Sequence, residues 1–375
     1  SKEKVDLTKQ FDQNASDYQW SSDDKKIYFT TEIRGTKQIY VVDLETKFIK
    51  PLTNGKHDVN TFKLKDNKIL ASIMSMKKAS ELYLVNAENG EMEMITSINK
   101  NIYDKVKMGE SREHWIKTVD GKQMLVWLIF PPDFDSTKKY PALLYCQGGP
   151  QSMVSQFFSF RWNFQIMAAN DYIIVAPNRR GLPGFGQEWN AQISGDYGGL
   201  NMQDYLSAID DAKKLPFVDA DHLGCVGASY GGFSVYWLAG HHQKRFKAFI
   251  AHCGMFNLES QYAETEEVFF TNHDLGGAYW EKDNKIAQRS YANSPHRFVQ
   301  NWDTPIMVIS GEHDFRIPFT ESLQAFNSAQ LLNIPSKLLI FPEESHFVLK
   351  PQNSILWQRE FFGWLDQWLK PKVIQ

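Results

Sequence analysis

The sequence is poor in cysteine and carries little excess charge. Its 375 residues include three cysteines, and 41 basic against 44 acidic residues leave a net charge of -3. Cys146, Cys225 and Cys253 all lie in or beside apolar runs, so we expect buried thiols rather than a disulfide framework or a metal site. The near balance of charge gives no electrostatic reason to expect nucleic acid or an anionic membrane as a partner.

Long apolar runs and cofactor motifs are also missing. No run reaches the roughly 18 apolar residues that a membrane-spanning helix needs. Residues 1–4 are charged or polar and lack the apolar core of a signal peptide. A targeting segment would lie before Ser1, and the expected compartments are the bacterial periplasm or the cytoplasm. Gly181–Gly186 superficially resembles a dinucleotide loop, but its spacing is wrong and Pro183 interrupts it, so we expect no cofactor and no metal.

Residues 1–98 contain short strand-like runs separated by polar turns, and the same order occurs twice. The runs are Ile27–Thr30, Gln38–Val42 and Phe48–Ile49, then Ile69–Ser72, Leu82–Val85 and Met92–Ile95. Tyr40 and Tyr83, like Thr53 and Thr96, are 43 positions apart. A repeat of four short strands with this period is typical of β-propeller blades.

Two blades cannot close a propeller, which typically needs about four to eight. We therefore expect residues 1–98 to be the two C-terminal blades of a truncated propeller, and the chain to be the C-terminal part of a longer protein. A small two-sheet accessory domain is the alternative. The mass of the native protein would distinguish the two.

Residues 99–375 alternate apolar strand-like runs with helical patterns. Ala142–Cys146 and Tyr172–Ala176 are wholly apolar, as expected of strands that are buried on both faces. Further strands are expected at Lys247–Ala251, Ile306–Ser310 and Lys337–Phe341, and helices at Met202–Leu215, Ser322–Leu332 and Ile355–Leu369. The alternation indicates an α/β fold with a mostly parallel sheet and helices on both faces.

The stretch Gly227–Gly231 places a serine between two different patterns. The apolar run Leu223–Val226 precedes it and the helical run Phe233–Ala239 follows it, so Ser229 lies at the apex of a sharp turn. Such a turn strains the serine backbone and brings chains close together, which requires small neighbours. Strand, turn and helix in this order are typical of the nucleophile elbow of an α/β-hydrolase.

A serine nucleophile needs a histidine base and a carboxylate that orients the base. In an α/β-hydrolase the acid and then the histidine follow on the loops after later strands. We expect Asp314 to be the acid because it lies deeper in its loop, with Glu312 as the alternative, and His346 to be the base. The histidines interpreted as structural are His57, His241, His242 and His296.

The oxyanion of the tetrahedral intermediate needs hydrogen-bond donors. One is the N–H of the residue after the nucleophile, Tyr230. The second is expected from Gln147–Pro150, the loop after the strand that ends at Cys146, where glycines permit close backbone approach.

Together these motifs resemble the prolyl oligopeptidase family of serine peptidases, which joins a propeller to an α/β-hydrolase domain. The matching segments are Gln147–Pro150, Pro177–Gly181, Gly184–Gly186, Gly195–Asp196, Gly227–Gly232 and Asp314–Pro318. Within the family the chain is most similar to the dipeptidyl-peptidase and acylaminoacyl-peptidase branches. The resemblance implies a catalytic domain over residues 99–375.

The resemblance also implies roles for single residues. Ser229, Asp314 and His346 fall on the catalytic triad, and Arg316 matches an arginine that binds the P2 carbonyl of the substrate. For Arg316 a surface salt bridge is the alternative.

Gly148 matches a glycine whose N–H serves the oxyanion. Many relatives carry tyrosine or histidine where Gln147 stands, so the Gly148 N–H is the expected second donor and the Gln147 amide a lesser candidate. The family's apolar S1 pocket is drawn from the segment after the following strand and from the acid loop. The corresponding residues are Met255, Phe256, Tyr262, Phe269 and Ile317.

The expected function is hydrolysis of short peptides near their N-terminus through an acyl-enzyme, in the manner of a dipeptidyl-peptidase. The alternatives are an acylaminoacyl-peptidase or oligopeptidase of the same family, a carboxylesterase or lipase on the same scaffold, and a propeller-type binding protein with an inactive hydrolase domain. Short peptides are the expected partners, without nucleic acid or a membrane span. Whether the chain forms a homo-oligomer is left open by the sequence.

Overall fold

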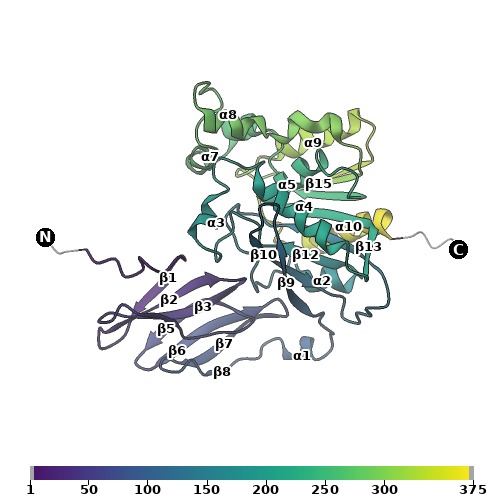
Figure 1. The fold of residues 1–375 in the computed structure, drawn as a ribbon. Coiled ribbons are helices and arrows are strands. Elements are labelled where there is room, and N and C mark those ends of the chain that lie inside the picture. The colour runs from purple at the N-terminus through teal and green to yellow at the C-terminus, as the bar shows by residue number, and fades with distance from the viewer. Residues whose placement is uncertain (1–3, 371–375) are drawn as a thin grey trace. The chain divides into compact units, whose positions relative to one another are not determined.

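The structure is a computed structural model that describes residues 4–370 as two compact units (Figure 1). The first comprises the described part of Ser1–Gly109 together with Met153–Gln165 and Leu182–Asn190. The second comprises Glu110–Ser152, Ile166–Gly181 and the described part of Ala191–Gln375. The units follow contacts in space rather than one cut in the chain, and the predicted boundary at residue 98 stays a prediction.

Within residues 4–370, the first unit is built on an eight-stranded sheet of two antiparallel meanders. The strands are β1 (Ser16–Trp20), β2 (Lys26–Ile33), β3 (Thr36–Asp43), β4 (Ile49–Pro51), β5 (Asp58–Lys65), β6 (Lys68–Ser75), β7 (Lys78–Asn86) and β8 (Met92–Met94). The meanders β1–β4 and β5–β8 join where Lys37 of β3 pairs with Asp58 of β5. A short helix, α1 (Lys100–Tyr103), follows.

The repeat seen in the sequence recurs in the hydrogen bonds. Thr53 Oγ1 accepts the N–H of Ile39 at 2.9 Å, and Thr96 Oγ1 accepts the N–H of Leu82, 43 positions after Ile39, at 2.8 Å. Each threonine thereby ties the end of its meander to the meander's third strand. The 43-residue period therefore marks two copies of one four-stranded motif.

Two segments from later in the chain belong to the first unit. Ser155 Oγ donates to Asp58 Oδ2 at 2.5 Å, and the Arg34 N–H donates to Gly184 O at 3.0 Å. Burial raises the pKa of Asp58 to about 6, although its hydrogen bonds, with Ser155 foremost, oppose the shift. These contacts bind residues 153–165 and 182–190 to the strands β2–β5.

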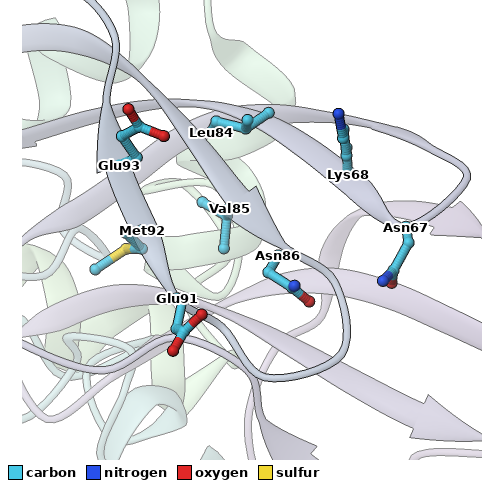
Figure 2. A pocket seen from close by; sticks show the side chains of 8 residues that line it. All are labelled: Asn67, Lys68, Leu84, Val85, Asn86, Glu91, Met92 and Glu93. Atoms are coloured by element: carbon cyan, nitrogen blue, oxygen red, sulfur yellow. The ribbon is translucent and has the colours of Figure 1, made fainter.

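Figure 2 shows a hollow on the second meander, beside the turn between β7 and β8. The residues that line it are Asn67, Lys68, Leu84, Val85, Asn86, Glu91, Met92 and Glu93. None of these side chains is a serine, cysteine or histidine, so the hollow lacks the residue types of a serine nucleophile and its histidine base.

Among the described residues, the second unit is built on an eight-stranded mixed sheet in the order β16–β15–β14–β13–β11–β12–β10–β9. The strands are β9 (Ser111–Lys117), β10 (Gln123–Ile129), β11 (Tyr140–Cys146), β12 (Ile173–Pro177), β13 (Val218–Ala228), β14 (Ala248–His252), β15 (Ile306–Gly311) and β16 (Ser336–Phe341). The pairs from β12 to β16 are parallel, whereas β10 is antiparallel to both β9 and β12. The mostly parallel α/β sheet predicted from the sequence is confirmed.

The helices lie between the strands along the chain. They are α2 (Phe164–Ala169), α3 (Gln187–Ala191), α4 (Leu200–Ala212), α5 (Tyr230–Ala239), α6 (Leu258–Glu264), α7 (Val268–Leu275), α8 (Lys285–Ala292), a 3-10 helix (Pro295–Asn301), α9 (Phe319–Leu331) and α10 (Pro351–Leu369). Helix α4 buries Tyr205, Leu206, Ile209 and Ala212 along one face. No helix within residues 4–370 combines the length and the hydropathy needed to cross a bilayer.

Two glycines of β13 show that helices cover both faces of this sheet. A Cβ on Gly224 would lie 2.8 Å from Leu369 of α10, and a Cβ on Gly227 would lie 2.5 Å from Gly231 of α5. Side chains three positions apart on a strand point to opposite faces. Helices α10 and α5 therefore pack on opposite faces of the sheet.

Candidate active site

Ser229 occupies the turn between β13 and α5. Its φ and ψ are 61° and -126°, values that a residue other than glycine adopts only when its surroundings impose them. Its N–H donates to His252 O at 3.0 Å. A Cβ on Gly231 would lie 2.0 Å from Cys146 O, so only glycine fits where α5 starts against the end of β11. The turn thus holds a partly exposed serine at the carboxyl ends of the parallel strands.

Asp314 and His346 form a buried, hydrogen-bonded pair on the loops after β15 and β16. His346 Nδ1 is 2.7 Å from Asp314 Oδ2, and the side chains are 9% and 0% exposed. The other carboxylate oxygen accepts the N–H groups of Arg316 and Ile317 at 3.1 and 2.9 Å, which prevents the carboxylate from turning away. Glu312, the alternative acid, is exposed on the same loop.

Cys253 lies against His346. Its Sγ is 3.7 Å from His346 O and 4.0 Å from His346 Nε2. Because Cys253 directly follows His252, whose carbonyl holds Ser229, the serine and the histidine flank one dipeptide at the end of β14. Burial opposes the charged imidazolium, but the Cys253 sulfur and the Asp314 carboxylate outweigh burial and raise the pKa of His346.

The same three side chains could share a metal ion. Among the described residues, ligand atoms of Cys253, Asp314 and His346 all lie within 4.8 Å of one another. A metal ion would have to displace the Asp314–His346 hydrogen bond, and the second Asp314 oxygen already accepts two N–H groups. The arrangement therefore suits proton transfer better than metal binding.

The loop that begins at Gln147 runs beside Ser229. A Cβ on Gly148 would lie 3.0 Å from Ala228 O and 3.5 Å from Ser229 Cβ, so the loop backbone approaches Ser229 closely. Tyr230 begins α5, where the first N–H groups of a helix have no acceptor within the helix. Backbone N–H groups from two elements are therefore available near the serine.

The Gln147 side chain is engaged within its own loop. It is 8% exposed, and its Nε2 donates to Ser152 Oγ at 3.2 Å. This bond engages the Gln147 amide with Ser152, and the Gly148 N–H stays the expected second donor to the oxyanion.

Arg316 forms an ion pair at the rim of the acid loop. Its Nε is 2.9 Å from Glu267 Oε1, and both side chains are more than a third exposed. Its backbone is anchored, because Arg316 O accepts from Gln261 Nε2 at 2.9 Å and from Thr265 Oγ1 at 2.7 Å. The salt bridge that the sequence offered as an alternative is present, and the Arg316 side chain remains 37% exposed.

The residues expected to form the S1 pocket have different surroundings. Met255 and Ile317 are buried, and the Phe256 ring packs against Tyr236 and Trp302. Tyr262 lies among the rings of Tyr279, Trp280 and Tyr291. Phe269 is 88% exposed on α7. The Phe256 ring is thus part of the core, whereas Phe269 is presented to solvent.

Sequence reasoning did not identify Glu344, which holds the histidine loop. Its carboxylate accepts the N–H groups of Leu349 and Lys350, both at 3.0 Å, and Glu344 O accepts the His313 N–H at 3.0 Å. The residue thereby links the start of α10 to the acid loop. An acidic residue shortly before Pro351, a typical first residue of a helix, was the available signal.

Family comparisons match both parts of the chain. Residues 158–372 match the prolyl oligopeptidase family, and residues 5–124 match the dipeptidyl peptidase IV (DPP IV) N-terminal region. Dipeptidyl-peptidase 5 of Porphyromonas gingivalis is 56% identical over 360 residues, which are 96% of this chain and 53% of the relative. Dipeptidyl-peptidase 5 of Schizosaccharomyces pombe is 30% identical and covers 98% of this chain and 53% of the relative. The chain thus spans about half the length of these curated relatives.

Solved structures share the fold. Pyrococcus horikoshii acylaminoacyl peptidase superimposes with a TM-score of 0.86 at 24% identity, over 98% of this chain and 58% of that chain. Porphyromonas gingivalis dipeptidyl peptidase 4 superimposes with a TM-score of 0.80 at 16% identity, over 96% of this chain and 50% of that chain. The family match extends over more than half of the sequence, and this chain belongs to the prolyl oligopeptidase family of serine peptidases.

Proposed function

We propose that the protein releases dipeptides from the N-terminus of short peptides through an acyl-enzyme on Ser229. The observation that carries the proposal is the buried Asp314–His346 hydrogen bond beside a strained serine. Ser229 contacts His252, the last residue of β14, and His346 contacts the next residue, Cys253. The relatives named dipeptidyl-peptidase 5 support the choice of substrate.

In the proposed reaction, His346 Nε2 accepts the Ser229 hydroxyl proton as Oγ attacks the scissile carbonyl. Asp314 accepts the hydrogen bond from Nδ1–H, which keeps the imidazole in the required tautomer and stabilises the imidazolium. The Tyr230 and Gly148 N–H groups hold the oxyanion. The imidazolium then protonates the leaving amine, and water hydrolyses the acyl-enzyme by the same proton transfers in reverse.

Arg316 binds the P2 carbonyl of the substrate in this proposal, while Glu267 holds Nε and thereby aims the terminal N–H groups. A guanidinium presents five N–H donors in a fixed plane, so one carboxylate partner leaves others for the substrate. The buried Met255 and Ile317 are our proposed walls of the S1 pocket.

A panel of chromogenic dipeptides with free and blocked amino termini tests the proposal on the full-length protein. We expect release only from dipeptides with a free amine, and none from the Ser229→Ala variant. Preference for blocked amino acids would instead favour an acylaminoacyl-peptidase. Turnover of simple esters with no peptide turnover would favour a carboxylesterase.

A further inference from the structure

Arg179 is a buried cation that the proposed mechanism does not use. It follows β12 and is 0% exposed. Its Nε donates to Tyr205 Oη at 3.0 Å, and its Nη1 donates to Arg180 O at 2.9 Å. A buried charge is costly unless hydrogen bonds compensate it. These two bonds therefore hold the guanidinium in one orientation.

The third nitrogen reaches the oxyanion loop at two places. Nη2 donates to Pro150 O at 3.0 Å and, at a longer 3.5 Å, to Gln147 O. The Tyr205 hydroxyl, which accepts from Arg179, itself donates to Gln147 O at 3.4 Å. One guanidinium thus connects both ends of the loop, directly and through a tyrosine.

The Gln147 carbonyl shares a peptide unit with the Gly148 N–H. This unit is trans, and the C=O and N–H of a planar trans peptide point in opposite directions. Donors that hold Gln147 O therefore aim the Gly148 N–H away from themselves, and hydrogen bonds in such a chain polarise one another. Arg179 Cζ also lies 4.6 Å from the ring centroid of Tyr230, the residue that supplies the other proposed donor.

We propose that Arg179, in part through the Tyr205 hydroxyl, is a positioning residue that sets the direction and polarity of the Gly148 N–H. It acts through the peptide unit and does not touch the substrate. Lysine would keep the charge but has no rigid planar fork to hold a hydroxyl and three carbonyls together, so the role requires arginine. This inference rests on the proposed acyl transfer at Ser229.

The test compares Arg179→Met, Arg179→Lys and Tyr205→Phe in the full-length protein. The matched control is Arg245→Met, because Arg245 is a largely buried arginine of the same unit whose bonds go to Asp210, Gln243 and the His242 carbonyl. Turnover of p-nitrophenyl acetate reports on acyl transfer. Inhibition by a peptide aldehyde, which forms a hemiacetal oxyanion with the serine, reports on the oxyanion site, and thermal unfolding reports on stability.

Removing one oxyanion donor costs about 100- to 1000-fold in kcat, so a misdirected donor is expected to cost less. We expect Arg179→Met to lower kcat on the order of 30-fold, with KM within twofold, and to weaken aldehyde inhibition by a similar factor. The kcat and the aldehyde inhibition of Arg179→Lys should lie between those of Arg179→Met and the wild type. Tyr205→Phe should lower kcat and weaken aldehyde inhibition, each on the order of threefold. Arg245→Met should change the melting temperature but neither kcat nor inhibition.

Wild-type kcat in Arg179→Met, an equal loss in Arg245→Met, or a lower kcat with unchanged aldehyde affinity would overturn the inference. If Arg179→Met does not fold, Tyr205→Phe is the deciding variant. Wild-type kcat and wild-type aldehyde inhibition in Tyr205→Phe would contradict the connection from Arg179 through the Tyr205 hydroxyl to Gln147 O. The ester separates this test from the proposed function. Ser229-dependent ester hydrolysis without dipeptide release would refute the substrate class and leave the role of Arg179 to be judged on its own.

Discussion

The two sheets use the polar residues near their strand ends in opposite ways. In the first unit, the hydroxyls of Thr53 and Thr96 accept N–H groups of a neighbouring strand and remain within the sheet. In the second unit, Ser229, Asp314 and His346 follow parallel strands, whose carboxyl ends meet at one edge where ligands commonly bind. Substitutions at the threonines of the first unit should therefore change the free energy of unfolding. Substitutions at Ser229, Asp314 or His346 should change the reaction rate.

Ser229→Ala is expected to have the largest effect. Loss of the nucleophile should lower turnover by about 10⁴- to 10⁶-fold, because binding and the oxyanion donors alone supply the residual rate. The melting temperature should stay near the wild-type value, since alanine keeps the backbone and its bond to His252 O. Ser328→Ala, which removes a hydroxyl from α9, is the matched control and should retain full activity. A clearly lower melting temperature in Ser229→Ala would contradict the expectation that strand-end residues of the second unit affect reaction rate rather than stability.

Asp314→Asn should be the next most damaging change. It preserves the shape of the acid but leaves His346 in the wrong tautomer, at a cost of about 10⁴-fold in kcat. Glu312→Gln, at an exposed position of the same loop, should have no such effect. A large loss in Glu312→Gln with a small one in Asp314→Asn would transfer the acid role to Glu312.

Gly231→Ala tests the nucleophile turn against an ordinary helix position. The new Cβ would lie 2.0 Å from Cys146 O, so β11 and α5 would have to separate, at a cost of about 3 kcal/mol or more in folding free energy. Gly363→Ala, at an exposed position in α10 with no atom within 4 Å of the new Cβ, should instead stabilise the protein by up to about 1 kcal/mol. Urea unfolding measures the free energy of unfolding of both variants. Equal changes in the two would show that the close approach of α5 to the end of β11 is not required.

The pH dependence of kcat/KM tests the surroundings of His346. Only the neutral imidazole can accept the serine proton, so the rate should rise as pH passes through the histidine pKa. The pKa of His346 is raised, so the midpoint should lie above the usual value of about 6.5. Asp314→Asn removes part of that shift and should move the midpoint down while the plateau falls. A wild-type midpoint below 6.5 would contradict the assigned environment.

The sequence predicted most of the elements that position Ser229. Apolar runs such as Ile173–Pro177, in which all five residues are buried, mark strands covered on both faces. The strand before Ser229 and the helix after it could also be identified from their apolar residues. The pattern changes there from that of a strand to that of a helix, and glycines mark the change. The order of the later strands predicted Asp314 and His346, which the structure brings together as a buried pair.

Other features lacked a local signal. Strand β1 (Ser16–Trp20) has almost no buried side chain and β5 (Asp58–Lys65) contains an irregularity near Val59, so neither shows the alternation of a half-buried strand. Helices α6–α8 lie between β14 and β15 and were not predicted. Arg179 was singled out only as part of a motif, since no local pattern shows that its guanidinium reaches carbonyls of the loop after β11.

The smallest predicted effects compare the two meanders of the first unit. Thr53→Val removes the acceptor of the Ile39 N–H at a site that is 2% exposed, and it also breaks the 2.8 Å bond to Gln38 Oε1. Water cannot replace these partners, so we expect a loss of about 1–2 kcal/mol in the free energy of unfolding. Thr96→Val removes the equivalent bond to the Leu82 N–H and breaks a 2.6 Å bond to Glu81 Oε2, but Thr96 is only partly buried and the loss should be smaller.

Urea unfolding measures both variants, and p-nitrophenyl acetate turnover under native conditions should match the wild type in each. Equal destabilisation by the two substitutions would mean that burial does not set the cost of the repeated bond. A change in turnover without a change in stability would mean that strand ends in the first unit influence the reaction. That result would contradict the expectation that they affect stability alone.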